Sequence, residues 1–160
     1  MATGKQIQST GQAGEYLVAA EICRRGFIAS TFTGNVPDYD IVAVNENGKI
    51  LPIQVKAIRE KSWQFNAGKF LDIELKGTQQ TVRKSLNEPI KDLICVFVIL
   101  RQYGDDEFFI FTWKNLRSII KKNYPSPRVR PKNPESLHCA IGPEQIKNFK
   151  DNWDLILHLK

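Results

Sequence analysis

The feature that most constrains the fold of this chain is an apolar run, LICVFVIL, at residues 93–100. The run has the length of a β-strand and carries no polar side chain on either face. A strand of this kind has to be covered on both sides, as the central strands of α/β sheets are. With 160 residues, the chain is long enough for one domain with a substantial core and short for two. We therefore expect a single α/β domain over residues 1–160.

Other segments supply the elements around this strand. The stretch at residues 11–25 is rich in helix formers and ends in Arg24, Arg25 and Gly26, which is a typical helix stop. Residues 60–87 are compatible with strands or with a loop that reaches over a ligand. Periodicity and turn residues predict strands at 27–32, 39–44, 50–58 and 107–112, helices at 113–122 and 143–156, and a Pro-rich basic loop at 121–132.

The stretch PDYDIVAVNENGKILPIQVK, at residues 37–56, predicts a β-hairpin that turns at Asn47-Gly48. Alternate residues of a strand share a face, so Gln54 and Lys56 point one way and Val55 the other. Counting back from the turn places Asp40 beside these three residues. Glu15 interrupts an apolar stripe of the first helix and joins the group if that helix lies on the hairpin. The sequence thus predicts a small polar cluster, although a solvated edge hairpin would carry the same residues.

The residue types in this cluster suit the hydrolysis of phosphodiesters with Mg²⁺. This cation prefers oxygen ligands and is usually held by one or two carboxylates together with waters. We expect Asp40 to be the principal ligand, with Glu15, the Gln54 side-chain oxygen and the Val55 backbone carbonyl completing the shell. Lys56 would orient the attacking water or stabilise the charge that develops on the phosphate. Mn²⁺ is the expected substitute for Mg²⁺.

The combined motif GEY…PDYDIVA…IQVK, within residues 11–58, resembles the PD-(D/E)xK nuclease superfamily. It is most similar to archaeal Holliday-junction resolvases and small bacterial nucleases of that superfamily. The resemblance implies a restriction-endonuclease-like fold, in which a mixed central β-sheet is flanked by helices. It also implies catalytic roles for Glu15, Asp40, Gln54 and Lys56, with Asp38 as an alternative ligand. Gln54 stands where the motif has an acid, which removes one negative charge and predicts weaker metal binding.

The resemblance implies a Mg²⁺-dependent DNA endonuclease that acts in restriction, in homing, or in junction and repair processing. The alternative is a catalytically inactive DNA-binding or assembly module with the same fold. Cutting both strands of a duplex needs two sites, so a homodimer or a higher even oligomer is expected by analogy with the family.

The distribution of charge favours a nucleic-acid partner. The net charge is +6, and residues 55–84 contain seven basic and three acidic residues, while residues 121–132 contain five basic residues and no acid. A solvated surface would also explain these charges. Aromatic residues at positions 63, 65 and 70 interleave with the cations and predict either base stacking or core packing. The candidate DNA-binding residues are Arg59, Lys61, Lys69, Arg83, Lys84, Arg128 and Arg130.

Other patterns narrow the class of protein. No run of about 18 apolar residues occurs, and the N-terminal segment has no signal-peptide core, so a cytoplasmic protein without membrane contact is expected. Cys23, Cys95 and Cys139 fit neither a zinc spacing nor a disulfide framework. His138 has no partner at metal-ligand spacing, and phosphate-binding loops and GxSxG or HExxH motifs are missing from the sequence.

Overall fold

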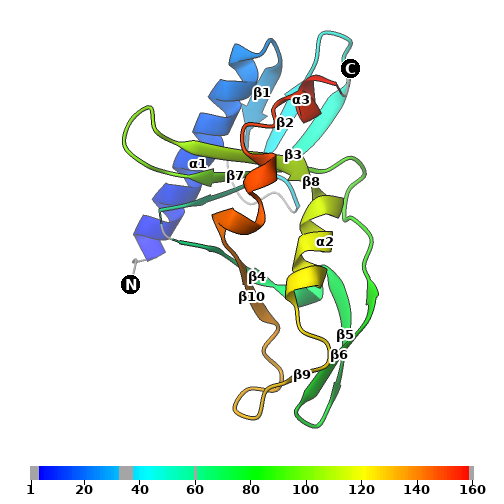
Figure 1. The fold of residues 1–160 in the computed structure, drawn as a ribbon. Helices are drawn as coiled ribbons and strands as arrows, with labels where there is room; N and C mark the ends of the chain where they lie inside the picture. The colour runs from blue at the N-terminus through cyan, green and yellow to red at the C-terminus, as the bar shows by residue number, and fades with distance from the viewer. Residues whose placement is uncertain (1–3, 33–37, 60, 159–160) are drawn as a thin grey trace.

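A five-stranded mixed sheet forms the centre of the computed structural model, which describes residues 4–32, 38–59 and 61–158. The strand order is β1-β2-β3-β7-β8 (Figure 1), and β3 pairs in parallel with β7 while the other neighbours are antiparallel. The expected mixed α/β fold, with a central sheet flanked by helices, is confirmed. The strands are β1 (Ile28–Thr31), β2 (Ile41–Val44), β3 (Ile50–Ile58), β7 (Ile94–Ile99) and β8 (Glu107–Thr112).

The two sequence features that predicted this sheet act as expected. All six residues of β7 are buried, because both faces of the central strand are covered. The hairpin between β2 and β3 turns where Asn45 accepts hydrogen bonds on Oδ1 from the backbone N–H groups of Asn47 and Lys49. Gly48 adopts φ 76°, a conformation that glycine tolerates without strain.

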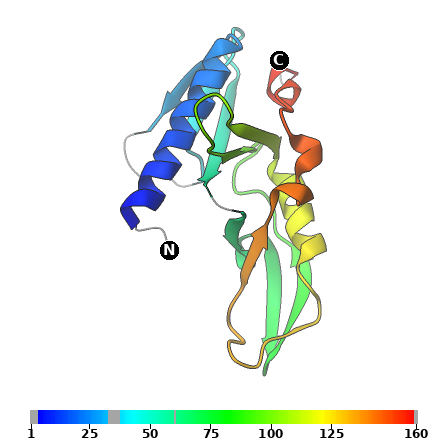
Figure 2. The same ribbon diagram turned by 60° about the vertical axis from the view of Figure 1, so that its left-hand side comes forward.

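Helices cover both faces of the sheet, as the two views in Figures 1 and 2 show. Helix α1 (Gly4–Arg24) begins earlier than residue 11 and packs on one face together with the short helix α3 (Asp154–Leu157). Helix α2 (Trp113–Asn123) packs on the other face. Its N-terminus is fixed by a capping box, in which Thr112 and Asn115 satisfy each other's backbone N–H groups.

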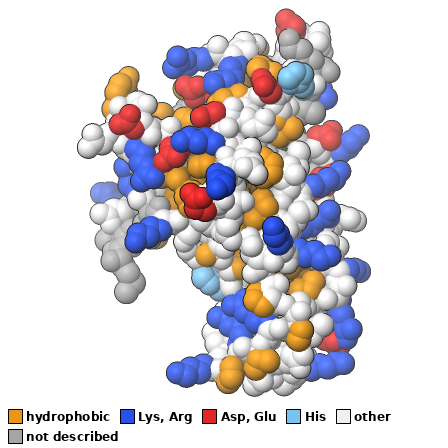
Figure 3. Space-filling view, viewed as in Figure 1, with side chains coloured by type: hydrophobic (Ala, Val, Ile, Leu, Met, Phe, Trp, Pro, Cys, Tyr) orange, Lys and Arg blue, Asp and Glu red, His pale blue; other side chains and the backbone are white. Residues whose placement is uncertain are grey.

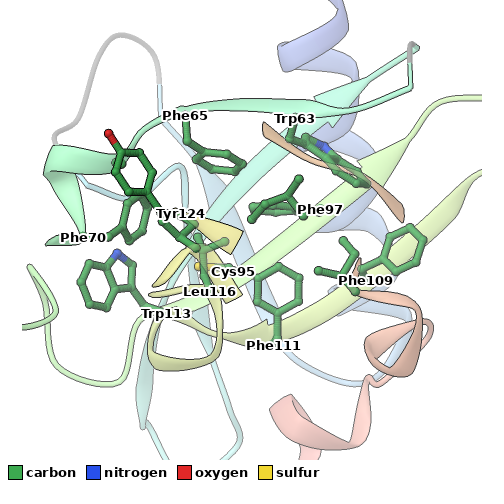
Figure 4. Close-up of a cluster of buried hydrophobic side chains, with 14 of the residues drawn as sticks. Trp63, Phe65, Phe70, Cys95, Phe97, Phe109, Phe111, Trp113, Leu116 and Tyr124 are labelled. Carbon is green, nitrogen blue, oxygen red and sulfur yellow. The ribbon is translucent and has the colours of Figure 1, made fainter. Parts of the chain in front are cut away.

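An aromatic cluster fills the layer between the sheet and α2 (Figure 4). The Phe97 ring lies 5.1 Å from Trp63, 5.6 Å from Phe65 and 4.8 Å from Phe111, measured between ring centroids. Phe70 stacks on Trp113 at 5.2 Å. The aromatic residues at positions 63, 65 and 70 therefore belong to the core, which was one of the two expectations for them.

Residues 60–87 contribute strands to two smaller sheets. Strand β4 (Trp63–Asn66) pairs with β10 (His138–Ile141), and a 3-10 turn at Ala67–Lys69 follows β4. The three-stranded arm, as we call the second small sheet, projects away from the central sheet (Figures 1 and 2). It consists of β5 (Leu71–Lys76), β6 (Gln79–Ser85) and β9 (Arg128–Val129). The expected loop at residues 121–132 is only partly a loop, because it begins inside α2 and contains β9.

The expected C-terminal helix at residues 143–156 is wrong. This segment forms two 3-10 turns, Pro143–Gln145 and Lys147–Phe149, before the four-residue α3. Lys150 makes an isolated bridge with Phe109 on β8, and the Asp151 N–H donates to the carbonyl of Phe108 at 2.9 Å. Asp151 then takes φ 52°, outside the helical region. Backbone pairing with the edge strand thus replaces a continuous helix.

Within the described residues, no helix is both long and apolar enough to span a membrane. All three cysteines are free, with Cys23 exposed, Cys139 half-buried and Cys95 buried in β7 of the central sheet.

Candidate active site

The β2–β3 hairpin holds Asp40 at the point where the two strands separate. Ile41 is the cross-strand partner of Ile53, so Asp40 lies level with Gln54. The Asp40 N–H donates to the Ile53 carbonyl at 2.8 Å, and its Oδ2 accepts from the Val55 N–H at 2.7 Å. The Asp40 carboxylate therefore accepts the next hydrogen bond from β3, beyond Ile41, which is the last paired residue of β2. This position is the one that the hairpin register predicted.

The Val55 carbonyl points to the same edge of β3 as its N–H, since both groups of a strand residue face one neighbour. The neighbouring residues of β3 use the other edge, as shown by the Ile58 carbonyl, which accepts from Leu100 at 2.8 Å. Val55 thus presents its carbonyl to the edge where the Asp40 side chain lies.

Helix α1 brings Glu15 to this edge through a close helix–strand contact. Gly14 is buried, and a Cβ at this position would overlap the Cβ of Ala57 on β3. The missing side chain allows the helix to approach the strand and fixes the position of the next residue, Glu15. Burial raises the pKa of Glu15, and the negative charge of Asp40 raises it further. Asp40 is therefore close enough to Glu15 for its charge to oppose the ionisation of Glu15.

The pKa of Asp40 is also raised, chiefly by burial. The hydrogen bond from Val55 and the charge of Lys56 act in the opposite direction without cancelling the effect of burial. Among the described residues, neither Asp40 nor Glu15 has a salt bridge. Two half-buried carboxylates without a neutralising partner make an unfavourable arrangement that a bound cation would relieve.

Gln54 and Lys56 face the opposite side of β3 from Val55 and line an open cavity of about 890 Å³. The Nζ atom of Lys56 lies 5.3 Å from the centre of the Phe65 ring. Burial lowers the pKa of Lys56, the charge of Lys69 lowers it further, and Asp40 partly compensates. Lys56 therefore lines the cavity and also interacts electrostatically with Asp40 at the strand edge. Neither Asp40 nor Glu15 lines the cavity.

The donor set at this edge fits a hard divalent cation. Two carboxylates, one amide oxygen and one backbone carbonyl are all oxygen ligands of the kind that Mg²⁺ accepts. Within the part of the chain that the structure describes, no three His, Cys, Asp or Glu side chains gather as a metal site. The neutral Gln54 explains why no third acidic side chain is present, because it occupies the strand position at which the superfamily motif has an acid.

Several residues of the cavity wall carried no usable signal in the sequence. His138 reaches the cavity because β10 pairs with β4, where His138 is opposite Asn66. Asn87 enters from the loop before β7. The pairing joins segments far apart in the chain, so no local pattern predicted it. The lining residues are Asp38, Gln54, Lys56, Gln64, Phe65, Asn66, Gly68, Lys69, Phe70, Leu86, Asn87, Pro89, Trp113, Glu135, Ser136, Leu137 and His138.

The candidate DNA-binding residues divide into two groups. Arg59, Lys61, Lys69 and Lys84 are exposed, and Lys69 also lines the cavity. The arginines of the three-stranded arm have internal partners. Arg83 pairs with Glu74, Arg128 lies over the Tyr124 ring and donates to the His138 carbonyl, and Arg130 donates to the Ser136 carbonyl and hydroxyl. Lys and Arg side chains nevertheless gather over the arm, in the lower part of the space-filling view (Figure 3).

Comparison with solved structures identifies a similar fold in a bacterial homing endonuclease, I-Ssp6803I. The two chains are 17% identical, superpose with a TM-score of 0.51, and match over 99% of this chain and 94% of the other. At this identity the likeness shows a shared fold. No protein-family model matches the sequence. No curated protein matches it either.

Proposed function

We propose that this protein is a metal-dependent DNA endonuclease that hydrolyses phosphodiester bonds. The observation that carries the proposal is the hydrogen bond from the Val55 N–H, which holds the Asp40 carboxylate at the edge of β3. There its charge raises the pKa of Glu15 and acts on the half-buried Lys56. A fold shared with a bacterial homing endonuclease supports the same reaction class.

In this proposal Asp40, Glu15, the Gln54 amide oxygen and the Val55 carbonyl hold Mg²⁺, or Mn²⁺ in its place. When bound, the cation polarises the phosphoryl oxygen and lowers the pKa of a coordinated water. The hydrogen bond from the Val55 N–H keeps one oxygen of Asp40 in place and leaves the other available. Glu15 adds the second negative charge from α1.

Lys56 then acts on the side of the cavity. Its ammonium group lies near the Phe65 ring and is reached by the field of Asp40. From this position it orients the attacking water or stabilises the charge that develops on the phosphate. Lys69, which lines the same cavity, supplies a second positive charge for the DNA backbone.

The substrate is double-stranded DNA, held along the cavity and the cationic surface of the three-stranded arm. Restriction, homing, and junction or repair processing are three settings for this activity. The structural neighbour is a homing endonuclease, which favours homing among them. A methyltransferase gene beside the coding sequence would favour restriction, whereas an interrupted, intron-bearing gene would favour homing.

Plasmid nicking tests the proposal. Supercoiled DNA is incubated with the protein in Mg²⁺ or Mn²⁺, and Lys56→Ala and Asp40→Ala are compared with the wild type. Each variant should lose at least about 100-fold in rate, because Asp40→Ala removes a ligand of the cation and Lys56→Ala removes the positive charge beside the reacting phosphate. Lys147→Ala is the matched control, since Lys147 is an exposed lysine whose salt bridge with Glu144 is remote from the cavity.

A second candidate function is a DNA-binding or assembly module that has lost catalysis. Gln54 favours it, because an amide in place of an acid removes one negative charge from the metal site. A wild type that binds duplex DNA at low salt but never cuts it, even with Mn²⁺ and varied substrates, would establish this alternative. Absence of DNA binding at low salt would contradict both functions.

A further inference from the structure

Three strands of the central sheet carry an apolar face on the side opposite α1. The register of β1, β2 and β3 aligns Ile28, Val44 and Ile50 in one row across the sheet. The next row on the same face contains Val42 and Pro52, together with Ser30. We call these six residues the outer face.

Two large apolar side chains of the outer face are exposed to solvent, whereas Val42, Val44 and Pro52 are half-buried. Ile28 is 74% exposed and Ile50 is 63% exposed. Their strand neighbours Ala29 and Leu51, which point the other way, pack under α1 with the second core cluster. An antiparallel sheet with one solvated face normally alternates apolar and polar residues. The row formed by Ile28, Val44 and Ile50 is instead apolar across all three strands, and an exposed apolar row of this kind is typical of an interaction surface.

The chemistry of the outer face indicates what covers it. None of its six residues is charged, although the chain carries a net charge of +6. A nucleic acid would require cations here, and the chain has them instead on the three-stranded arm. An uncharged patch adds no repulsion when two copies of a basic protein meet, and apolar cores with few charges characterise homodimer interfaces.

The rim of the outer face is also self-complementary. The tip of the β2–β3 hairpin, next to Ile50, exposes one acid, Glu46, and one base, Lys49. In an interface with two-fold symmetry each residue meets the same surface of its partner, so a rim with both signs can pair with itself. We propose that the outer face is the dimer interface of this protein, and that its occupant is a second copy of the chain packed sheet against sheet.

This interface would also bring the two candidate active sites together. On β3, the outer-face residues Ile50 and Pro52 are followed on the same side by Gln54 and Lys56. Two-fold packing through the outer face therefore places both copies of β3 within one assembly, with their cavities on connected surfaces. This consequence rests on the proposed function, because only a nuclease needs two sites for the two strands of a duplex. The interface itself does not depend on that function.

Sedimentation velocity over a range of concentrations tests the interface. The wild type should be a dimer, and Ile50→Lys and Ile28→Lys should weaken self-association on the order of 100-fold, because each places two lysines in a symmetric apolar contact. Ile7→Lys is the matched control, because Ile7 on α1 has the same 63% exposure as Ile50 but lies away from the outer face. The control should remain dimeric, and circular dichroism should show that all variants fold.

Two results would overturn the proposal: a wild type that stays monomeric at tens of micromolar, or dimers of Ile50→Lys and Ile28→Lys as stable as those of the wild type. Plasmid cleavage separates this failure from failure of the proposed function. A monomeric Ile50→Lys variant should still nick supercoiled DNA but should lose most linearisation. A dimeric wild type that neither nicks nor linearises DNA would retain the interface and contradict the nuclease.

Discussion

Gln54 is the residue on which the chemistry of the candidate site depends most directly. It faces the cavity from β3, level with Asp40, and supplies a neutral oxygen where the resemblance to the nuclease superfamily implies an acid. The candidate site therefore has two carboxylates and one half-buried lysine, an arrangement poorer in negative charge than a three-carboxylate site.

Replacing Gln54 with Glu should raise the affinity for Mn²⁺ by roughly tenfold, because a third carboxylate joins the donor set. Isothermal titration calorimetry with Mn²⁺ measures this change. Gln64→Glu is the matched control, since it adds the same charge to the cavity wall from β4. Equal affinities of Gln54→Glu and the wild type would show that this side chain does not face the cation.

The raised pKa values of Asp40 and Glu15 predict how stability depends on pH in metal-free protein. Both carboxyl groups hold a proton more tightly when folded than when unfolded, so folding is favoured by them at low pH. That contribution is lost as pH rises above the ordinary carboxyl range and through their folded pKa values. Between about pH 4 and pH 7, Tm of the wild type should therefore fall relative to that of Asp40→Asn/Glu15→Gln.

Thermal unfolding in EDTA measures this difference, and addition of Mg²⁺ should recover part of it for the wild type alone. A difference in Tm that grows in favour of the wild type over the same pH range would show that the two carboxylates are not destabilised by burial.

Gly14 positions Glu15 through its contact with β3. Gly14→Ala should destabilise the protein by about 1–3 kcal/mol, because the new methyl group overlaps Ala57 and forces α1 away from the strand. Nicking should fall with it, since Glu15 moves. Gly11→Ala is the control, because Gly11 lies on the same helix with open space at its Cβ, and alanine there should be neutral or stabilising.

Urea denaturation and plasmid nicking together test the role of Gly14. Ala57→Gly in the Gly14→Ala background should restore both measurements, because it removes the overlapping Cβ. Failure of this rescue would mean that the helix–strand contact does not position Glu15.

At the scale of elements, Gln80 stabilises the part of the cavity wall formed by residues 135–138. Its side chain is 1% exposed, donates to the carbonyls of Pro134 and Ser136, and accepts from the Tyr124 hydroxyl. These contacts tie β6 and the end of α2 to the segment that leads into β10. The cavity wall at residues 135–138 is therefore held by a buried amide.

Gln80→Ala should destabilise the protein by about 2–3 kcal/mol, because it leaves buried polar groups without partners. Hydrogen exchange should accelerate at residues 134–138 more than in β7. The neighbouring Gln79→Ala provides the control, since Gln79 is exposed on the same strand and its loss should have little effect. Similar stabilities of the two variants would contradict the role of Gln80.

The sequence was most informative where an element depends on its own residues. Strands β3 and β8 were predicted with the bounds that the structure gives them, because alternation and the Asn47-Gly48 turn are local signals. The helix at 143–156 failed because the main chain at Lys150 and Asp151 pairs with β8, a partner that no local pattern reveals. Likewise, the register of the hairpin predicted Asp40 beside β3, whereas the cavity wall around His138 depends on the pairing of β4 with β10.

At the scale of the whole molecule, charged side chains are distributed unevenly over the surface. The outer face is uncharged, and the cations of the three-stranded arm lie at the far end of the molecule from α3 (Figures 1 and 3). Arg83 joins β6 to β5 through Glu74, whereas Arg128 and Arg130 connect the end of the arm to Tyr124 and Ser136. The exposed lysines remain available for phosphates.

Lys69→Ala and Lys84→Ala should each weaken binding to duplex DNA uniformly across sequences and reduce the slope of log K against log salt by about one. Fluorescence anisotropy with Ca²⁺ in place of Mg²⁺ measures this slope without cleavage. Lys147→Ala should leave the slope unchanged. An unaltered slope for both Lys69→Ala and Lys84→Ala would place the DNA elsewhere on the protein.

The pairing of β4 with β10 also sets the order in which the molecule is completed during synthesis. The residues of the candidate metal site, from Glu15 to Lys56, are all made in the first part of the chain. Strand β4 follows them at once, yet its partner β10 comes only at His138–Ile141. A nascent chain on the ribosome, which emerges from its N-terminus, therefore carries the ligands before it has the cavity that surrounds Lys56. The residues of the candidate metal site and the cavity beside them are thus separated in time.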